Sequence, residues 1–132
     1  SLVISLNTVL AAWEKAKTVP NDVADVWIHG DIHARNIIVA DGRFKTLVDW
    51  GDMCVGDPAA DIAAAWMLFP ISAHCEFRDG AGPITDATWE RARGSAIALG
   101  VILVDAGDSV DPAWAESGRR VLERACGAPP ST

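Results

Sequence analysis

The feature that most constrains this 132-residue chain is a polar loop set between two apolar segments. The loop reads His29-Gly30-Asp31-Ile32-His33-Ala34-Arg35-Asn36, and short apolar runs at 26–28 and 37–39 flank it. Apolar runs of this length that contain β-branched residues predict buried strands. Because buried strands on both sides can hold the loop's side chains accurately, we expect a functional site here.

A second acidic segment follows shortly after the first. Two β-prone runs, 37–40 and 44–49, are joined by Asp41-Gly42-Arg43, in which the glycine can adopt a positive φ. A hairpin at this point would reverse the chain and bring Asp49 back beside the polar loop. We therefore predict a small β-hairpin that carries a metal site.

The spacing of polar residues in the two segments matches the catalytic elements of protein kinases. Asp31 and Asn36 lie five residues apart, as do the kinase Asp that deprotonates the attacking hydroxyl and the Asn that binds magnesium. Asp49-Trp50-Gly51 matches the Asp-Phe-Gly element, whose Asp binds magnesium. Because Mg²⁺ prefers oxygen ligands, we predict that Asn36 and Asp49 bind it together with ATP phosphates.

The run from His29 to Asp61 resembles the aminoglycoside phosphotransferase and choline-kinase-like branch of the protein-kinase-like fold. The catalytic loop of that family is commonly His-Gly-Asp-Leu-His-Pro-Gly-Asn, and Gly-Asp-Pro and Asp-Leu-Ala follow its Asp-aromatic-Gly element. The corresponding residues here are Gly56-Asp57-Pro58 and Asp61-Ile62-Ala63. One departure is Ala34-Arg35 in place of Pro-Gly, which puts a cation beside the catalytic positions.

The resemblance implies an α+β, mainly helical fold, the C-terminal lobe of the protein-kinase-like fold, as a single domain over residues 1–132. It implies transfer of the ATP γ-phosphoryl group to a hydroxyl of a small molecule, with Mg²⁺ and ATP. The expected roles are catalytic for Asp31, cofactor binding for His33, Asn36 and Asp49, metal binding for Asn36 and Asp49, and structural support for His29, Asp57 and Asp61.

Three side chains near the site have two interpretations each. His33 either packs against the site or contacts phosphate. Asp52 is either a second metal contact or a turn carboxylate. Asp61 lies between apolar neighbours and needs hydrogen-bond donors if it is buried, so we predict that it accepts bonds from the backbone of residues 29–31. Stabilisation of a helix dipole is its alternative role.

Two other functions fit parts of the pattern. One is a non-catalytic binding lobe that keeps the kinase-like fold without turnover. The other is a metallophosphatase, because Gly30-Asp31-Ile32-His33 resembles the Gly-Asp-x-His opening of two-metal enzymes. That class needs further acidic and Asn-His elements downstream, and His74, the only later histidine, stands in no such context.

A kinase-like phosphotransferase also needs a Gly-rich loop and a strand lysine that hold the ATP phosphates. Neither pattern is visible, since the three lysines are Lys15, Lys17 and Lys45. We therefore expect the N-terminal nucleotide-binding lobe to be absent and the isolated lobe to be inactive. Apolar surface at the interlobe face is then expected to be exposed, and it could mediate oligomerisation.

The amino-acid composition limits the classes of molecule that the chain is expected to bind. A net charge of -7 and a pI near 4.7 argue against nucleic acid and would suit a cationic acceptor. Aminoglycoside, macrolide, choline-like amine, sugar and homoserine acceptors all remain open.

Three widely spaced cysteines indicate a reduced cytoplasmic setting, and no apolar run is long enough for a membrane span. Acidic side chains that could recognise amines are Glu76, Asp79, Asp86, Asp105, Asp108 and Glu116.

Apolar periodicity and capping residues predict four helices. The first covers residues 2–18 and is expected to bury its apolar stripe under the catalytic loop. Asp57-Pro58 starts a second helix that ends before Pro70. The third has Asp86 as its N-cap and is about 16 residues long, and the last starts at Asp111-Pro112 and ends at Gly127. Residues 71–85 are predicted to form a loop.

Overall fold

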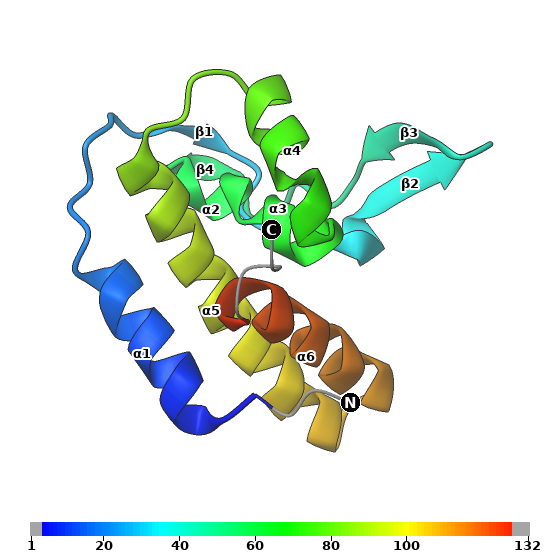
Figure 1. Cartoon of the computed structure of the whole chain (residues 1–132). Coiled ribbons are helices and arrows are strands. Elements are labelled where there is room, and N and C mark those ends of the chain that lie inside the picture. The colour runs from blue at the N-terminus through cyan, green and yellow to red at the C-terminus, as the bar shows by residue number, and fades with distance from the viewer. Residues whose placement is uncertain (1–3, 128–132) are drawn as a thin grey trace.

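A computed structural model describes residues 4–127 of the chain. The fold is mainly helical with two small antiparallel strand pairs, so the predicted α+β class is confirmed (Figure 1). None of the described helices combines the length and the apolar character that crossing a membrane requires. The elements are α1 Leu6–Lys17, β1 Val26–Ile28, the 3-10 turn η1 Ala34–Asn36, β2 Ile37–Ala40, β3 Arg43–Leu47, β4 Cys54–Gly56, α2 Ala59–Ile62, α3 Ala64–Leu68, the 3-10 turn η2 Ile71–Ala73, α4 His74–Gly80, α5 Asp86–Ser109 and α6 Pro112–Cys126.

The predicted β-hairpin is present as β2 and β3, and it projects from the helical body (Figure 1). Its turn residues Asp41 and Gly42 have φ values of 54° and 70°. Two consecutive positive φ angles are typical of the type I′ turn, whose twist matches that of the strands. The local sequence therefore determines this element.

The second strand pair joins segments that are distant in the sequence. β1 runs antiparallel to β4, with Trp27 opposite Val55 and Ile28 opposite Cys54. The sequence predicted β1 from its apolar run but not β4, because Cys54-Val55-Gly56 forms no such run. This pairing fixes the point at which the polar loop leaves β1.

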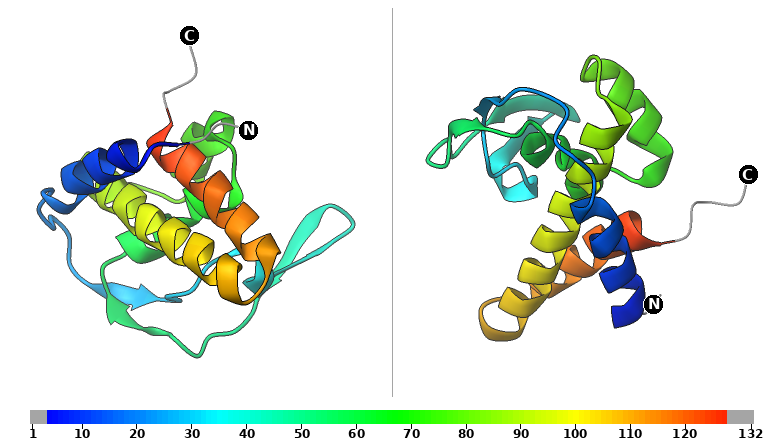
Figure 2. Two further views of the ribbon diagram at one scale, coloured as in Figure 1. Left: turned by 90° about the horizontal axis from the view of Figure 1, so that it is seen from below. Right: turned by 90° about the vertical axis from the view of Figure 1, so that its left-hand side faces the viewer.

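Helix α5 is the centre of the helical body, and α1, α2 and α6 pack against it (Figures 1 and 2). The core between these helices consists mostly of alanines around Trp66 and Ile97. Small side chains allow the helix axes to approach closely. The buried apolar core residues are Ala12, Ala59, Ala63, Ala65, Trp66, Ala92, Ala96, Ile97, Val121 and Ala125.

Helix α1 does not have the predicted position under the catalytic loop. It packs against α5 and α6 instead (Figure 2). Its buried residues are Ala12 and Ala16, whereas Leu6 is 71% exposed and Leu10 is 48% exposed. Val9 and Trp13 of the predicted apolar stripe pack against the core, and Ala16 is buried, so part of the stripe is buried against the helices and not under the catalytic loop.

The region from Pro58 to Pro83 departs from the sequence prediction in two places. The predicted single helix is divided at Ala63 into α2 and α3. Residues 71–85, predicted as a loop, contain η2 and α4. Glycine and proline near residues 80–83 signalled a turn correctly, but the aromatic packing of Phe77 and the buried His74 stabilises a helix ahead of that turn.

Helix α5 is longer than predicted and starts one residue earlier. Thr85, not Asp86, is its N-cap, since the Thr85 hydroxyl accepts a hydrogen bond from the Thr88 backbone N–H at 3.0 Å. The helix has 24 residues. The last helix, α6, starts as predicted, because the Asp111 carboxylate accepts a bond from the Ala113 backbone N–H at 2.9 Å and Pro112 takes the first position.

Glycines allow α5 and α6 to approach closely. A Cβ atom added at Gly118 would lie 2.6 Å from the Gly100 carbonyl oxygen and 2.8 Å from the Val104 backbone nitrogen. Both neighbours are main-chain atoms of α5, so only a movement of a whole helix could make room. The same two helices form walls of the pocket described below.

We expect Gly118→Ala to lower the free energy of unfolding by about 2 kcal/mol, because overpacking of the helix interface exceeds the gain in helix propensity. Urea denaturation measures this change. Gly80→Ala is the matched control, since an added Cβ there meets nothing within 4 Å. The control should leave the free energy of unfolding unchanged or raise it slightly. An equal decrease of this free energy in both variants would contradict overpacking at Gly118 as the cause.

Candidate active site

The polar loop and the Asp49 segment lie side by side, as the hairpin prediction required. The Val48 backbone N–H donates to the Asn36 carbonyl at 2.8 Å. The Trp50 ring packs edge-on against the His29 ring at a centroid distance of 4.6 Å. Gly30, with a φ of 90°, approaches so closely that an added Cβ would lie 2.9 Å from the Asp52 carbonyl oxygen. A larger residue at this position would separate the two segments.

His29 is a structural residue of the loop. It is buried, its Nδ1 accepts a hydrogen bond from the Asp31 backbone N–H at 3.1 Å, and its Nε2 lies 2.9 Å from the Val48 carbonyl oxygen. Since Nδ1 acts as an acceptor, the ring proton is on Nε2, where it is donated to Val48. One side chain thus connects both segments of the site, in agreement with the predicted supporting role.

Asp61 makes the backbone contacts that the sequence predicted. Its Oδ2 accepts from the His29 backbone N–H at 2.7 Å, and its Oδ1 accepts from the Gly30 backbone N–H at 3.0 Å. Hydrogen bonds to an ionised carboxylate are stronger than those between neutral groups. Asp61 in α2 therefore anchors the start of the loop, and its effect on catalysis stays a prediction.

Asp31, His33 and Asn36 contact one another at the centre of the loop. The Asn36 Nδ2 group donates to the Asp31 carbonyl at 2.8 Å and lies 3.2 Å from Asp31 Oδ2. His33 Nδ1 accepts from the Arg35 backbone N–H at 3.2 Å, which leaves Nε2 facing Asp31 Oδ1 at 3.4 Å. The Asp31 carboxylate is thus oriented by both neighbours, and whether His33 also contacts phosphate stays open.

Asn36 and Asp49, the predicted magnesium ligands, have side-chain oxygen atoms that are free of hydrogen-bonding contacts in the described part of the chain. Within residues 4–127, neither Asn36 Oδ1 nor the Asp49 carboxylate has a hydrogen-bonding partner in the protein. Asp49 is exposed and has a φ of 59°, a left-handed conformation that is uncommon outside glycine and is found at functional sites. Oxygen ligands of this kind match the preference of Mg²⁺.

A site made of protein side chains alone is not formed. No group of three or more His, Cys, Asp or Glu side chains in the described part of the chain could hold a metal ion. The predicted ligands, an amide and a carboxylate, leave the remaining positions to phosphate oxygens and water. Asp52 is exposed in the turn after Asp49, and its role as a second metal contact stays a prediction.

Asp57 is part of an ion cluster that the sequence did not reveal. Its two carboxylate oxygens accept from Arg91 Nε and Nη2 at 2.9 and 3.1 Å, and Arg91 Nη1 also reaches Asp22 at 3.2 Å. Arg91 holds the pKa of Asp57 below its ordinary value, although partial burial acts in the opposite direction. Asp57 also caps α2 through the Ala59 backbone N–H at 3.0 Å. The supporting role is therefore to join α2 to α5.

Arg35, the departure from the family loop, crosses to the start of α6. Its Nη2 lies 3.3 Å from Asp111 Oδ2, and its guanidinium stacks over the Trp114 ring at 4.7 Å from the centroid. Stacking of a planar cation on an aromatic ring, with an ion pair at its edge, is favoured by arginine. The cation beside the catalytic positions thus ties the loop to α6, which no local sequence signal indicated.

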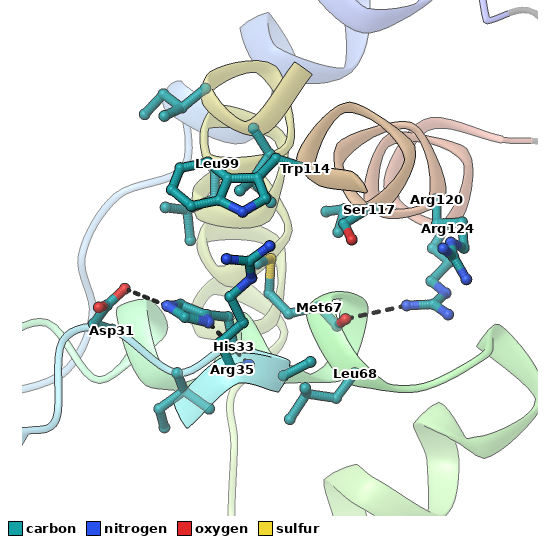
Figure 3. Close-up of a pocket in the computed structure, with 15 residues that line it drawn as sticks. Asp31, His33, Arg35, Met67, Leu68, Leu99, Trp114, Ser117, Arg120 and Arg124 are labelled. Atoms are coloured by element: carbon teal, nitrogen blue, oxygen red, sulfur yellow. Dashed lines mark hydrogen bonds and ion pairs between the residues drawn. The ribbon is translucent and has the colours of Figure 1, made fainter. Parts of the chain in front are cut away.

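A pocket of about 580 Å³ opens beside Asp31, between the loop, α3, α5 and α6 (Figure 3). Most of its lining is apolar, with one carboxylate and three arginines. It is the cavity in which a substrate could reach the Asp31 carboxylate. The lining residues are Asp31, Ile32, His33, Ala34, Arg35, Met67, Leu68, Leu99, Ile102, Leu103, Trp114, Ser117, Arg120, Val121 and Arg124.

The acidic side chains proposed for amine recognition are not part of this pocket. Within residues 4–127, none of the six lines it. The net negative charge of the chain therefore does not describe the charge of the cavity beside Asp31. The six are Glu76, Asp79, Asp86, Asp105, Asp108 and Glu116.

Comparison with known proteins agrees with the motifs. The model of the phosphotransferase enzyme family matches residues 5–94, which include both polar segments, Asp57 and Asp61. Searches against characterised proteins and against solved structures gave no significant match. Because the family match covers more than half of the chain, the chain belongs to the phosphotransferase enzyme family.

Proposed function

We propose that this chain forms the catalytic part of an ATP-dependent small-molecule kinase, with the C-terminal lobe of the protein-kinase-like fold. The observation that carries the proposal is the position of Asp31. Its carboxylate is oriented by His33 and Asn36, stands beside the Asp49 segment and faces a pocket of about 580 Å³. The family membership supports phosphoryl transfer as the reaction class.

In this reaction Asp31 orients the acceptor hydroxyl and takes its proton as the oxygen attacks the γ-phosphorus of ATP, the bond from that phosphorus to the β–γ bridging oxygen breaks, and ADP leaves. His33 and the Asn36 amide keep the carboxylate in place through the contacts described above. Asn36 and Asp49 would hold Mg²⁺, which offsets negative charge on the phosphates when bound. Loop rigidity, provided by His29 and Asp61, limits the reorganisation needed before transfer.

We propose that a nucleotide-binding lobe packs on the β1–β4 strand pair. Trp27 and Val55, directly opposite each other, are 72% and 56% exposed, and Trp50 and Met53 are exposed nearby in the chain. Exposed apolar patches mark interaction surfaces. The occupant is a nucleotide-binding lobe or, in its absence, a second copy of the chain.

Two alternatives have less support. A metallophosphatase would place further ligands near Asp31 and His33, but the described residues hold no cluster of three or more metal-binding side chains. A non-catalytic binding lobe would keep the fold but gives no reason for an oriented carboxylate at a pocket. Neither alternative explains why Asn36 Oδ1 and the Asp49 carboxylate, both possible metal ligands, accept no hydrogen bond within residues 4–127.

Magnesium binding tests the proposal. In the presence of ATP, Asp49→Asn should weaken magnesium affinity at least about tenfold, because a neutral amide replaces the main anionic ligand. Asparagine also accepts the left-handed backbone that Asp49 adopts, so the loop should keep its shape. Isothermal titration calorimetry on the native gene product measures the affinity.

Asp52→Asn is the matched control for that experiment. It removes the same charge from an exposed position three residues away. Equal weakening by both substitutions would show that only the total charge matters and would contradict a defined ligand role for Asp49. Weaker magnesium binding in Asp52→Asn alone would instead indicate that the metal lies at the turn beside Asp52.

A further inference from the structure

The pocket beside Asp31 has an uneven distribution of charge. Figure 3 shows Asp31 and His33 at one side and Arg120 and Arg124 of α6 at the other. Met67 and the Arg35 guanidinium, which stacks on Trp114, lie between these two sides, and most of the remaining lining is apolar. A molecule that filled this pocket would meet a carboxylate at one end, apolar walls with Arg35 beside them, and two further cations at the far end.

The two far-side cations have little compensation from the protein. Arg120 and Arg124 are one helical turn apart, and the nearest acidic group to Arg120 is Glu116 at 3.8 Å in an exposed pair. Arg124 Nη1 donates to the carbonyls of Trp66 and Met67, which are neutral. Burial, and to a smaller extent the nearby Arg120, lower the pKa of Arg124, although Glu123 acts in the opposite direction. An anion bound between these guanidinium groups would therefore be stabilised.

The indole N–H of Trp114, in the pocket wall, has no hydrogen-bonding partner among the described residues. Trp114 Nε1 is buried and has no hydrogen-bonding partner within residues 4–127. The Arg35 guanidinium stacks on the same ring, beside the catalytic loop. A buried donor without a partner is unfavourable, and an oxygen atom of a bound molecule could satisfy it if Arg35 shifted. Apart from the Ser117 hydroxyl, which can donate or accept, the polar side chains of this wall are donors and cations.

These features lie mostly outside the part of the chain that the family model matches. The match ends at residue 94, whereas Leu99, Trp114, Ser117, Arg120 and Arg124 all come later. Family membership therefore specifies the reaction end of the pocket but says nothing about the far wall. Only the chemistry of the lining residues indicates what binds there.

We propose that the acceptor of this phosphotransferase is a hydroxy acid with an apolar body, not a polyamine. This inference rests on the proposed function. The hydroxyl would lie at Asp31, the apolar body would contact Leu99 and Leu103, and the carboxylate would pair with Arg120 and Arg124. An amine at the far end would be repelled by the same two arginines.

Binding of three matched probes to the 132-residue chain tests the acceptor class. The probes are 10-hydroxydecanoate, 1,10-decanediol and 10-amino-1-decanol, which share length and hydroxyl but differ in charge. Calorimetry below their aggregation concentrations measures each Kd. We expect the hydroxy acid to bind about tenfold more tightly than the diol, and the amino alcohol to bind most weakly.

Two single substitutions on α6 locate the anion site. Arg120→Glu should weaken 10-hydroxydecanoate binding about tenfold and leave the diol nearly unchanged. Arg119→Glu is the matched control, because Arg119 is equally exposed, also pairs with Glu116 and does not line the pocket. The control should leave the affinity for all three probes nearly unchanged at physiological ionic strength, where charges a few residues apart are partly screened.

Several results would overturn the proposed acceptor class: tightest binding of the amino alcohol, equal affinity for all three probes, no binding of any probe, or equal losses in the two variants. None of these results depends on ATP or magnesium. Phosphoryl transfer itself is tested separately at Asp49 and Asp31, so a failure of the acceptor class is distinguishable from a failure of the reaction class.

Discussion

Asp31→Asn is expected to lower the rate of phosphoryl transfer about 10²- to 10⁴-fold, because an amide cannot take the proton of the attacking hydroxyl. The fold should tolerate the change. Asparagine has the same shape and keeps an oxygen that can accept from Asn36, and the bond from the Asn36 side-chain amide to the main-chain carbonyl of residue 31 is unaffected. We expect the melting temperature to stay within about 2 °C.

Steady-state transfer from ATP by the native gene product, together with thermal denaturation, measures both effects. Asp41→Asn is the control, since Asp41 is an exposed residue of the hairpin turn with a φ of 54° that suits asparagine equally well. Asp41→Asn should change neither the transfer rate nor the melting temperature. Retained transfer in Asp31→Asn would remove Asp31 as the base and favour the non-catalytic lobe or a different site.

Asp61→Ala is expected to lower the free energy of unfolding by about 3 kcal/mol and to weaken magnesium binding at least about tenfold. The substitution leaves the backbone N–H groups of His29 and Gly30 without their acceptor. The start of the catalytic loop would then no longer be anchored to α2, and the Asn36 ligand would lose its fixed position. Urea denaturation and magnesium titration in the presence of ATP measure the two effects.

Two further variants separate anchoring from general charge effects. Asp61→Asn keeps one acceptor oxygen and should lose roughly half of the stability that Asp61→Ala loses. Asp79→Ala removes an exposed carboxylate from α4 and should change the free energy of unfolding by no more than about 0.5 kcal/mol. An unchanged melting temperature and unchanged magnesium affinity in Asp61→Ala would refute the anchoring role.

The sequence by itself determined the elements whose causes are local. Asp41-Gly42 specified the hairpin turn, and Asp111-Pro112 specified the start of α6. The ordered motifs from His29 to Asp61 also identified the family and predicted the bonds from the loop backbone to Asp61. In each case a few neighbouring residues, or a motif of fixed spacing, carry the whole signal.

The tertiary structure alone decided the remaining features, because they depend on residues far apart in the chain. The β1–β4 pairing and the Arg91–Asp57 ion pair join distant segments. Helix α1 packs Val9, Ala12, Trp13 and Ala16 against the helical body and leaves Leu6 and Leu10 exposed, because its place beside α5 and α6 is set by residues distant in the sequence. The arginine-lined pocket forms only when α6 packs beside the loop, so a net charge summed over the chain could not predict its sign.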